Sequence, residues 1–367
     1  MDDQAVLQAI AQAYLTSGDF NGYPVPSLRR EFGLTTSEAK EAVRRLLRER
    51  KIDVIFGNVH PNPHIKAFSH ISNEDQRKFL DEFEFTDHIC LYPSREVLAT
   101  LPDVDRFKDS PFTHELALGA GQLDYRVFDL SVLEYYRNDP RYYYETDFVN
   151  GSISIHDEHF ESGTMADHDQ VLLQTFGFAY DDQLNRAVAV FLRYLSKLSP
   201  EHQRIWQTKK LSGVYKLHPD YYRNTILGDW GTRISIFEAF TQELKIINAM
   251  ATLMERPQLF RESFAEERPK EFGFLLRPTL AEFNAFVLLL DKMMSDNINK
   301  EFFANEIPLE EDEERPDGKI VVRQKGMIAL LEAWVRKYFR PANRKPMDHM
   351  FKGFRAVRKL RQKPATP

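Results

Sequence analysis

Residues 27–68 read SLRREFGLTTSEAKEAVRRLLRERKIDVIFGNVHPNPHIKAF, and this stretch decides the fold that we expect for the N-terminal part of the chain. Ser27 is a suitable N-cap for a short helix, and Gly33 is a suitable place for that helix to end. Thr35 or Thr36 begins a second, longer helix. The segments IDVIF and HIKAF flank the turn sequence GNVHPNP, which predicts two short paired strands. The expected order is therefore helix, helix and two-stranded hairpin.

The second of these helices has two distinct faces when residues 36–50 are placed on a wheel of about 100° per residue. Glu38 lies near the position that a capping box uses at the helix start. The apolar face consists of Ala39, Ala42, Val43, Leu46 and Leu47. The opposite, mostly basic face consists of Ser37, Lys40, Glu41, Arg44, Arg45 and Arg48. Because arginine has forked donors that match phosphate oxygens and guanine edges, this face is suited to a nucleic acid.

A further helix is expected over residues 3–16, where apolar residues recur at helical spacing. The order of helix, helix, basic helix and two-stranded wing resembles the winged-helix branch of the helix-turn-helix DNA-binding proteins, over residues 3–70. The resemblance implies that the DNA is contacted by Lys40, Arg44, Arg45 and Arg48, with Arg29 and Arg30 near its backbone.

The predicted wing adds one candidate and one departure from that family. Lys66, on the predicted second strand near the turn, is placed to touch a phosphate beside the groove. The wing carries Asn58, His60 and Asn62 where several cations are typical, so the resemblance does not extend to a minor-groove contact by the wing.

The composition limits the class of protein. A chain of 367 residues is too long for one compact core and predicts two or three domains. The net charge of −6 argues against a polyanion-binding surface over the whole molecule, so nucleic-acid contact must be local. One cysteine, Cys90, excludes an internal disulfide and a zinc ribbon and suits a reducing compartment. The chain starts without a secretion-signal pattern and has no apolar run of membrane-spanning length, so a cytoplasmic protein without a membrane partner is expected.

The remaining sequence predicts a mixed middle and a helical end. VLLQTFGFAY and RAVAVFLRYL, joined by the polar turn DDQLN, predict a hairpin, and GSISIHDEHF predicts a strand. Thr279 followed by Glu282 predicts the start of a later helix, and residues 306–319 predict an acidic loop. The expected fold class is α+β, mostly α. Its expected domains are a winged helix over 1–70, a mixed α/β domain over 71–228, and a helical bundle with a basic tail over 229–367.

The C-terminal tail is a second candidate for nucleic-acid contact. Between Arg336 and Lys363 eleven Lys or Arg residues face one acid, Asp348. The tail is expected either to bind RNA or DNA phosphates or to be shielded by the acidic loop within the fold. Its end contains RKLRQKPA and resembles uncharacterised bacterial proteins, which says little about function. The candidate contacts in the tail are Arg355, Arg358, Lys359 and Arg361.

Catalytic and metal sites have weaker signals. The densest group of potential metal ligands consists of His156, Glu158, His159 and His168, but its spacing matches no strong metal motif, and a solvated loop is the simpler interpretation. Arg344 and His349 have the spacing found in HEPN-type nucleases, with Pro346 between them. No dinucleotide or phosphate loop is present, and no cofactor is expected.

Three classes of function stay open at this point. The favoured one is a DNA-binding protein in regulation or bacterial genome defence, with no catalysis that the sequence locates. The second is an enzyme, either a metal-dependent or a HEPN-like nuclease. The third is an adaptor that binds a protein partner, or a second copy of itself, through the winged helix and the basic tail.

Overall fold

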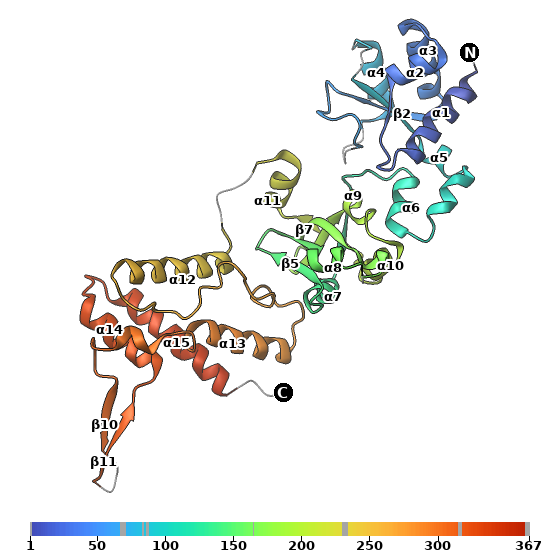
Figure 1. Ribbon diagram of the computed structural model, residues 1–367. Coiled ribbons are helices and arrows are strands. Elements are labelled where there is room, and N and C mark those ends of the chain that lie inside the picture. The colour runs from blue at the N-terminus through green and yellow to red at the C-terminus, as the bar shows by residue number, and fades with distance from the viewer. Residues whose placement is uncertain are drawn as a thin grey trace. The chain divides into compact units, whose positions relative to one another are not determined.

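The computed structural model describes residues 2–66, 71–82, 84–85, 88–163, 165–229, 234–314 and 318–363 (Figure 1). The chain forms two compact units. Unit 1 consists of Met1–Tyr144 and Val149–Asp229, and unit 2 consists of Glu145–Phe148 and Trp230–Pro367. The described residues contain both helices and strands, with more helix than strand, which confirms the α+β class. The finer division into three domains stays a prediction. Within the described residues, no helix has the length and apolar content needed to span a bilayer.

The N-terminal part of unit 1 combines four helices with a three-stranded antiparallel sheet. In chain order its elements are α1 (Asp3–Thr16), β1 (Tyr23–Pro24), α2 (Val25–Phe32), α3 (Thr36–Arg48), β2 (Ile52–Phe56), α4 (Asn73–Glu82) and β3 (Ile89–Pro93). The strand order is β1-β3-β2, with Tyr23 opposite Leu91 and Ile52 opposite Pro93. The apolar faces of the helices form one buried core with Ile89 and Leu91 of β3.

The predicted hairpin of IDVIF with HIKAF is wrong. β2 pairs with β3, which comes from the later segment HICLYP, and α4 lies between the two strands in sequence. His64, Ile65 and Lys66 are not in a strand, and the rest of HIKAF lies outside the described residues. Pro61 and Pro63 lack the backbone N–H that a strand donates to its neighbour, which disfavours a strand next to β2 in this segment. In contrast, every residue of β3 is buried.

The two predicted helices of this stretch are present, with one shifted start. Thr35 accepts a hydrogen bond from the backbone N–H of Glu38, and the Glu38 carboxylate accepts one from the N–H of Thr35, which confirms the capping box. Gly33 ends α2 in the left-handed conformation, with φ of 62°. However, α2 begins at Val25 and not after Ser27, because Pro26 lies in its first turn, where proline is well accommodated.

The second half of unit 1 is built on an antiparallel sheet. Its strands are β4 (Tyr125–Phe128), β5 (Tyr142–Thr146), β6 (Asn150–Ile155), β7 (Leu172–Tyr180), β8 (Arg186–Phe191) and β9 (Lys216–Leu217). The order is β4-β8-β7-β6-β5, and β9 pairs with β7. The predicted hairpin is confirmed, since β7 and β8 pair with Tyr180 opposite Arg186. The short helices of this unit are α5 (Arg95–Leu98), α6 (Pro111–Ala117), α7 (Glu134–Arg137), α8 (Asp157–Glu161), α9 (Leu192–Leu195), α10 (Pro200–Thr208) and α11 (Pro219–Tyr222).

Unit 2 is mainly helical. Its elements are α12 (Ile236–Leu253), α13 (Leu280–Met294), β10 (Glu310–Glu314), β11 (Ile320–Gln324), α14 (Met327–Tyr338) and α15 (Lys345–Gln362). The predicted start of α13 is confirmed, since the hydroxyl of Thr279 accepts from the N–H of Glu282. The predicted acidic loop is wrong over residues 310–314. These residues form β10, which pairs with β11, a strand rich in β-branched residues. The two strands make an exposed hairpin that projects from the helices (Figure 1).

Candidate nucleic-acid interface

Helix α3 is fixed in unit 1 by its apolar face. Ala39, Ala42, Val43, Leu46 and Leu47 are all fully buried, as the helical wheel predicted. At the C-terminal end of the helix, the Asn73 side chain on α4 donates a hydrogen bond to the carbonyl of Leu47 (3.0 Å). The basic residues are therefore left on the opposite side and on the two flanks of the helix.

Arg45 is engaged by the first turn of α1. Its Nε and Nη2 donate to the two carboxylate oxygens of Asp3, at 2.8 Å and 2.7 Å. This paired geometry is the strongest that arginine makes with a carboxylate. The hydrogen bond from Arg45 lowers the pKa of Asp3, so the pair is charged at neutral pH. Arg45 is thus committed to the packing of α1 against α3, and a phosphate must compete with Asp3 for it.

Arg44 is engaged by α4. Its Nη2 donates to Asp81 Oδ1 at 2.5 Å, and it also pairs with Glu41 on its own helix. The hydrogen bond from Arg44 lowers the pKa of Asp81, and the positive charges of Lys40 and Arg48 act in the same direction. An acidic group therefore lies among three cations of α3. Nothing in the sequence of α4 indicated this contact.

Four of the predicted cations of α2 and α3 have no carboxylate partner within 4 Å among the described residues: Arg29, Arg30, Lys40 and Arg48. Arg30 and Arg48 are exposed, and Lys40 is half-buried. Arg29 is also half-buried, and its Nε has no hydrogen-bond partner in the part of the chain that the structure describes. These residues make the cationic surface that a polyanion can reach.

The prediction that Lys66 touches a phosphate is wrong. Only 3% of its side-chain surface is exposed, and its Nζ lies 3.2 Å from Asp53 Oδ2 and 3.5 Å from the carbonyl oxygen of Gly119. Its backbone N–H donates to the side chain of Gln122 (2.8 Å). Lys66 follows a turn and is not in a strand, and its ammonium group points inward to Asp53.

The C-terminal cations are largely paired within unit 2. Arg358 and Arg361 of α15 both contact Asp291 on α13, at 3.2 Å and 2.6 Å, and both also pair with Asp296. Burial acts to raise the pKa of Asp296, but its hydrogen bonds with the two arginines lower it overall. A further pair of this helix joins Arg355 to Glu332 of α14.

These ion pairs show which acids balance the positive charge of the tail. The arginines of α15 pair with acids of α13, α14 and the turn after α13, and no ion pair joins them to Glu310–Glu314 in the described part of unit 2. Lys359 is the candidate residue of the tail that is exposed and has no ion pair there. Most of the predicted basic surface of the tail therefore holds α15 against α13 and α14.

Replacing Asp291 by asparagine tests this assignment. The Asp291 side chain is fully buried and neutralises two arginines, so Asp291→Asn should destabilise the contact between α13 and α15 by about 2–3 kcal/mol. Hydrogen exchange of the α15 amides reports the loss directly. Asp348→Asn removes an exposed partner of Arg336 and should cost less than about 1 kcal/mol. Equal protection in both variants would contradict the structural role.

The four weak metal candidates do not assemble into a site. The predicted strand GSISIHDEHF is wrong beyond Ile155, because His156 is the N-cap residue of α8 and Glu158 lies in that helix. The ring of His156 lies against Tyr143, with 3.5 Å between ring centroids. His159 Nε2 lies 3.8 Å from Glu158 Oε1, and His168 Nε2 lies 3.7 Å from Asp169 Oδ1. No group of three or more metal-ligating side chains occurs among the described residues.

One buried polar network escaped the sequence prediction. Trp206 Nε1 donates to Tyr136 Oη (2.9 Å), which lies 2.8 Å from His202 Nδ1, and His202 Nε2 lies 3.3 Å from Asp169 Oδ1. Burial lowers the pKa of His202, which keeps the ring neutral. Since Trp206 and Tyr136 are fully buried, we interpret this chain as a satisfied core network.

The nuclease-like pair lies at the start of α15. Arg344 is the N-cap residue, and His349 follows in the first turns of the helix; both are exposed. Pro346 does not disturb the helix, because proline in the first turn removes an N–H that has no helical partner. No group of three or more potential metal ligands includes His349 in the described chain.

Comparison with known proteins adds no assignment. No protein-family model, no curated protein and no solved structure matches the chain. The functional argument therefore rests on the geometry described above.

Proposed function

We propose that the N-terminal part of unit 1 is a winged-helix module that binds duplex DNA through α3. The observation that carries the proposal is the order α1-β1-α2-α3-β2-α4-β3 with the sheet order β1-β3-β2. This arrangement leaves one face of α3 outside the core, and a helix of that kind enters the major groove in helix-turn-helix proteins. Arg48 of α3 and Arg30 of α2 are exposed, and Lys40 of α3 is half-buried.

The charges of α3 define how such a complex forms. Lys40 and Arg48 contact phosphates directly, because neither must leave a carboxylate first. Arg44 binds DNA only when it exchanges Asp81 and Glu41 for a phosphate or a base edge. Arg45 stays with Asp3. The module therefore binds the DNA backbone more strongly than it reads bases, and its affinity is limited by the acids beside α3.

The segment between β2 and β3 distinguishes this module from a short wing. It contains α4, which packs against α3 and carries Asp81. An acid beside the groove-facing helix repels phosphates and selects how closely the DNA approaches. Asp81 is thus the residue that sets the strength of DNA binding.

Replacing Asp81 by asparagine tests this function. Asp81→Asn keeps the shape of the side chain, removes its charge and leaves Arg44 paired with Glu41 alone, so duplex affinity should rise about tenfold at low salt. Fluorescence anisotropy with a labelled duplex measures the change. Asp182→Asn is the matched control, because Asp182 forms a comparable exposed pair with Lys216 elsewhere in unit 1. An affinity that stays equal or falls in Asp81→Asn would contradict the proposal.

A protein-binding adaptor is the second candidate, and a specific observation favours it. Two of the arginines on the outer side of α3, Arg44 and Arg45, are already neutralised by Asp3, Glu41 and Asp81, and many charged helix faces of this kind contact proteins. Co-purification after nuclease treatment separates the two functions. A partner that survives the treatment supports the adaptor, and loss of all bound material supports DNA binding.

A further inference from the structure

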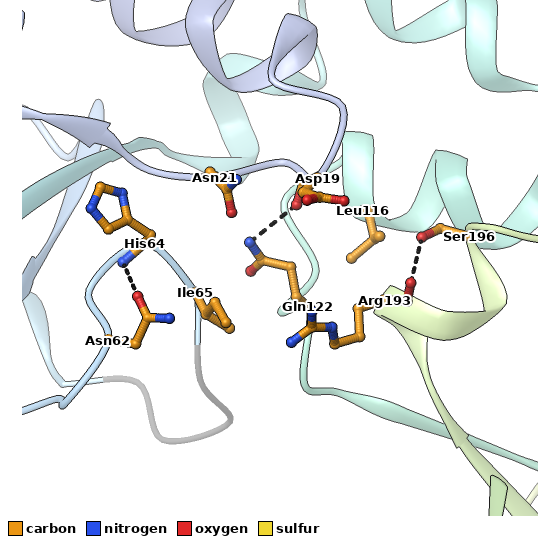
Figure 2. Close-up of a pocket in the computed structure, with 9 residues that line it drawn as sticks. All are labelled: Asp19, Asn21, Asn62, His64, Ile65, Leu116, Gln122, Arg193 and Ser196. Carbon is orange, nitrogen blue, oxygen red and sulfur yellow. Dashed lines mark hydrogen bonds between the residues drawn. The ribbon is translucent and has the colours of Figure 1, made fainter. Parts of the chain in front are cut away.

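A polar pocket lies in unit 1, apart from α3. It has a volume of about 230 Å³ and opens where four segments meet: the loop after α1, the loop after β2, residues 116–122, and α9 (Figure 2). That size is sufficient for a small metabolite.

The wall of the pocket is held in place by Gln122. This side chain is 3% exposed, and its Oε1 accepts from the backbone N–H of Lys66 (2.8 Å). Its Nε2 donates to the carbonyls of Phe20 (2.8 Å) and Asp19 (3.3 Å). Phe20 has a positive φ of 56°, which is strained for a bulky residue, and its ring is buried against Tyr14. The loop that carries Asp19 is therefore fixed before any ligand arrives.

Two opposite charges line this pocket without a partner. The guanidinium of Arg193 lies over the ring of Tyr194 and has no carboxylate within 4 Å in the described chain. The Asp19 carboxylate likewise has no described cation within that distance, so the two residues do not pair with each other. In Figure 2, Arg193 extends from α9 toward Gln122, and Asp19 lies on the other side of Gln122.

We propose that this pocket binds a small zwitterion of the α-amino acid class. The ligand carboxylate pairs with the forked donors of Arg193, and its ammonium group pairs with Asp19. Leu116 and Ile65 provide an apolar wall for a side chain, and Asn21 adds an amide for its polar atoms. A ligand with both charges pairs with Arg193 and Asp19 together, whereas a simple anion or cation would pair with only one of them. This site is independent of the DNA-binding surface.

Isothermal titration of the full chain with the standard L-α-amino acids tests the proposal. At least one should bind with a stoichiometry of one. Its N-acetyl derivative, which lacks the ammonium group, and its amide, which lacks the carboxylate, should each bind about tenfold more weakly or worse. Arg193→Gln and Asp19→Asn should lose affinity by a similar factor. Lys197→Gln changes an exposed neighbour outside the pocket and should bind like the wild type.

The alternatives give distinct results. If no amino acid binds the wild type, the proposal is wrong. If the N-acetyl derivative binds as well as the parent, the pocket is an anion site and Asp19 has no role. If affinity persists in Arg193→Gln, the ligand binds elsewhere. Arg193→Lys keeps the charge but loses the fork, so an intermediate affinity in that variant supports the paired carboxylate contact.

Discussion

Reversing the two unpaired cations of α3, Lys40→Glu together with Arg48→Glu, should lower duplex affinity about hundredfold at low salt. Neither residue is held by a carboxylate among the described residues, so the substitutions break no ion pair of the fold. Each replaces an attraction to phosphate by a repulsion. Anisotropy with a labelled duplex measures the loss, and thermal unfolding checks that the variant is folded.

The control must carry the same change of net charge at another place. Lys108→Glu with Lys216→Glu meets this need, since both lysines are exposed members of surface pairs away from α3. This control should lose less than about threefold in affinity, through the overall charge alone. An equal loss in both double variants would show that binding is not located on α3.

Replacing Gly177 by alanine should destabilise unit 1 by about 3 kcal/mol. Gly177 lies in β7 opposite Ala189, and a methyl group there would meet the ring of Tyr221 at 2.2 Å. That ring is fully buried and stacked on Phe191, so it has little freedom to move away. Hydrogen exchange of the β7 and β8 amides should show the loss.

Two further variants make this test specific. In a Tyr221→Ala background the space for the methyl group is open, so Gly177→Ala should cost about 1 kcal/mol or less. Gly353→Ala, on the exposed side of α15 with nothing within 4 Å, should instead stabilise its helix by about 0.5–1 kcal/mol. A cost for Gly177→Ala that is the same in both backgrounds would contradict the close approach of Tyr221.

Local signals in the sequence predicted local structure well. The capping box of Thr35 and Glu38, the glycine stop at Gly33 and the start of α13 at Thr279 each depend on residues within one turn. The buried face of α3 followed from helical periodicity in the same way. These features need no knowledge of the rest of the chain.

The pairing of distant segments was beyond such signals. β2 could pair with HIKAF or with HICLYP by pattern alone, and only the burial of β3 between β1 and β2 decides the choice. The prediction for Lys66 was wrong for this reason, because its position depended on a strand that does not form there.

The state of the arginines also depended on distant contacts. Arg44 binds Asp81, which lies 37 residues away in the sequence, and Arg45 binds Asp3, which lies 42 residues away. In α15, Arg361 binds Asp291, which lies 70 residues away in the sequence. Helical periodicity places a charge on a face but does not say which element lies against that face. The basic face of α3 was therefore predicted, but its partial neutralisation was not.

The salt dependence of duplex binding by the full chain tests the central claim most directly. With Arg30, Lys40 and Arg48 as phosphate contacts, log affinity should fall against log salt with a slope of about −2.7. The Lys40→Glu and Arg48→Glu double variant should bring that slope to about −1 or shallower. A slope near zero in the wild type, or no duplex binding at low salt, would contradict DNA binding through α3.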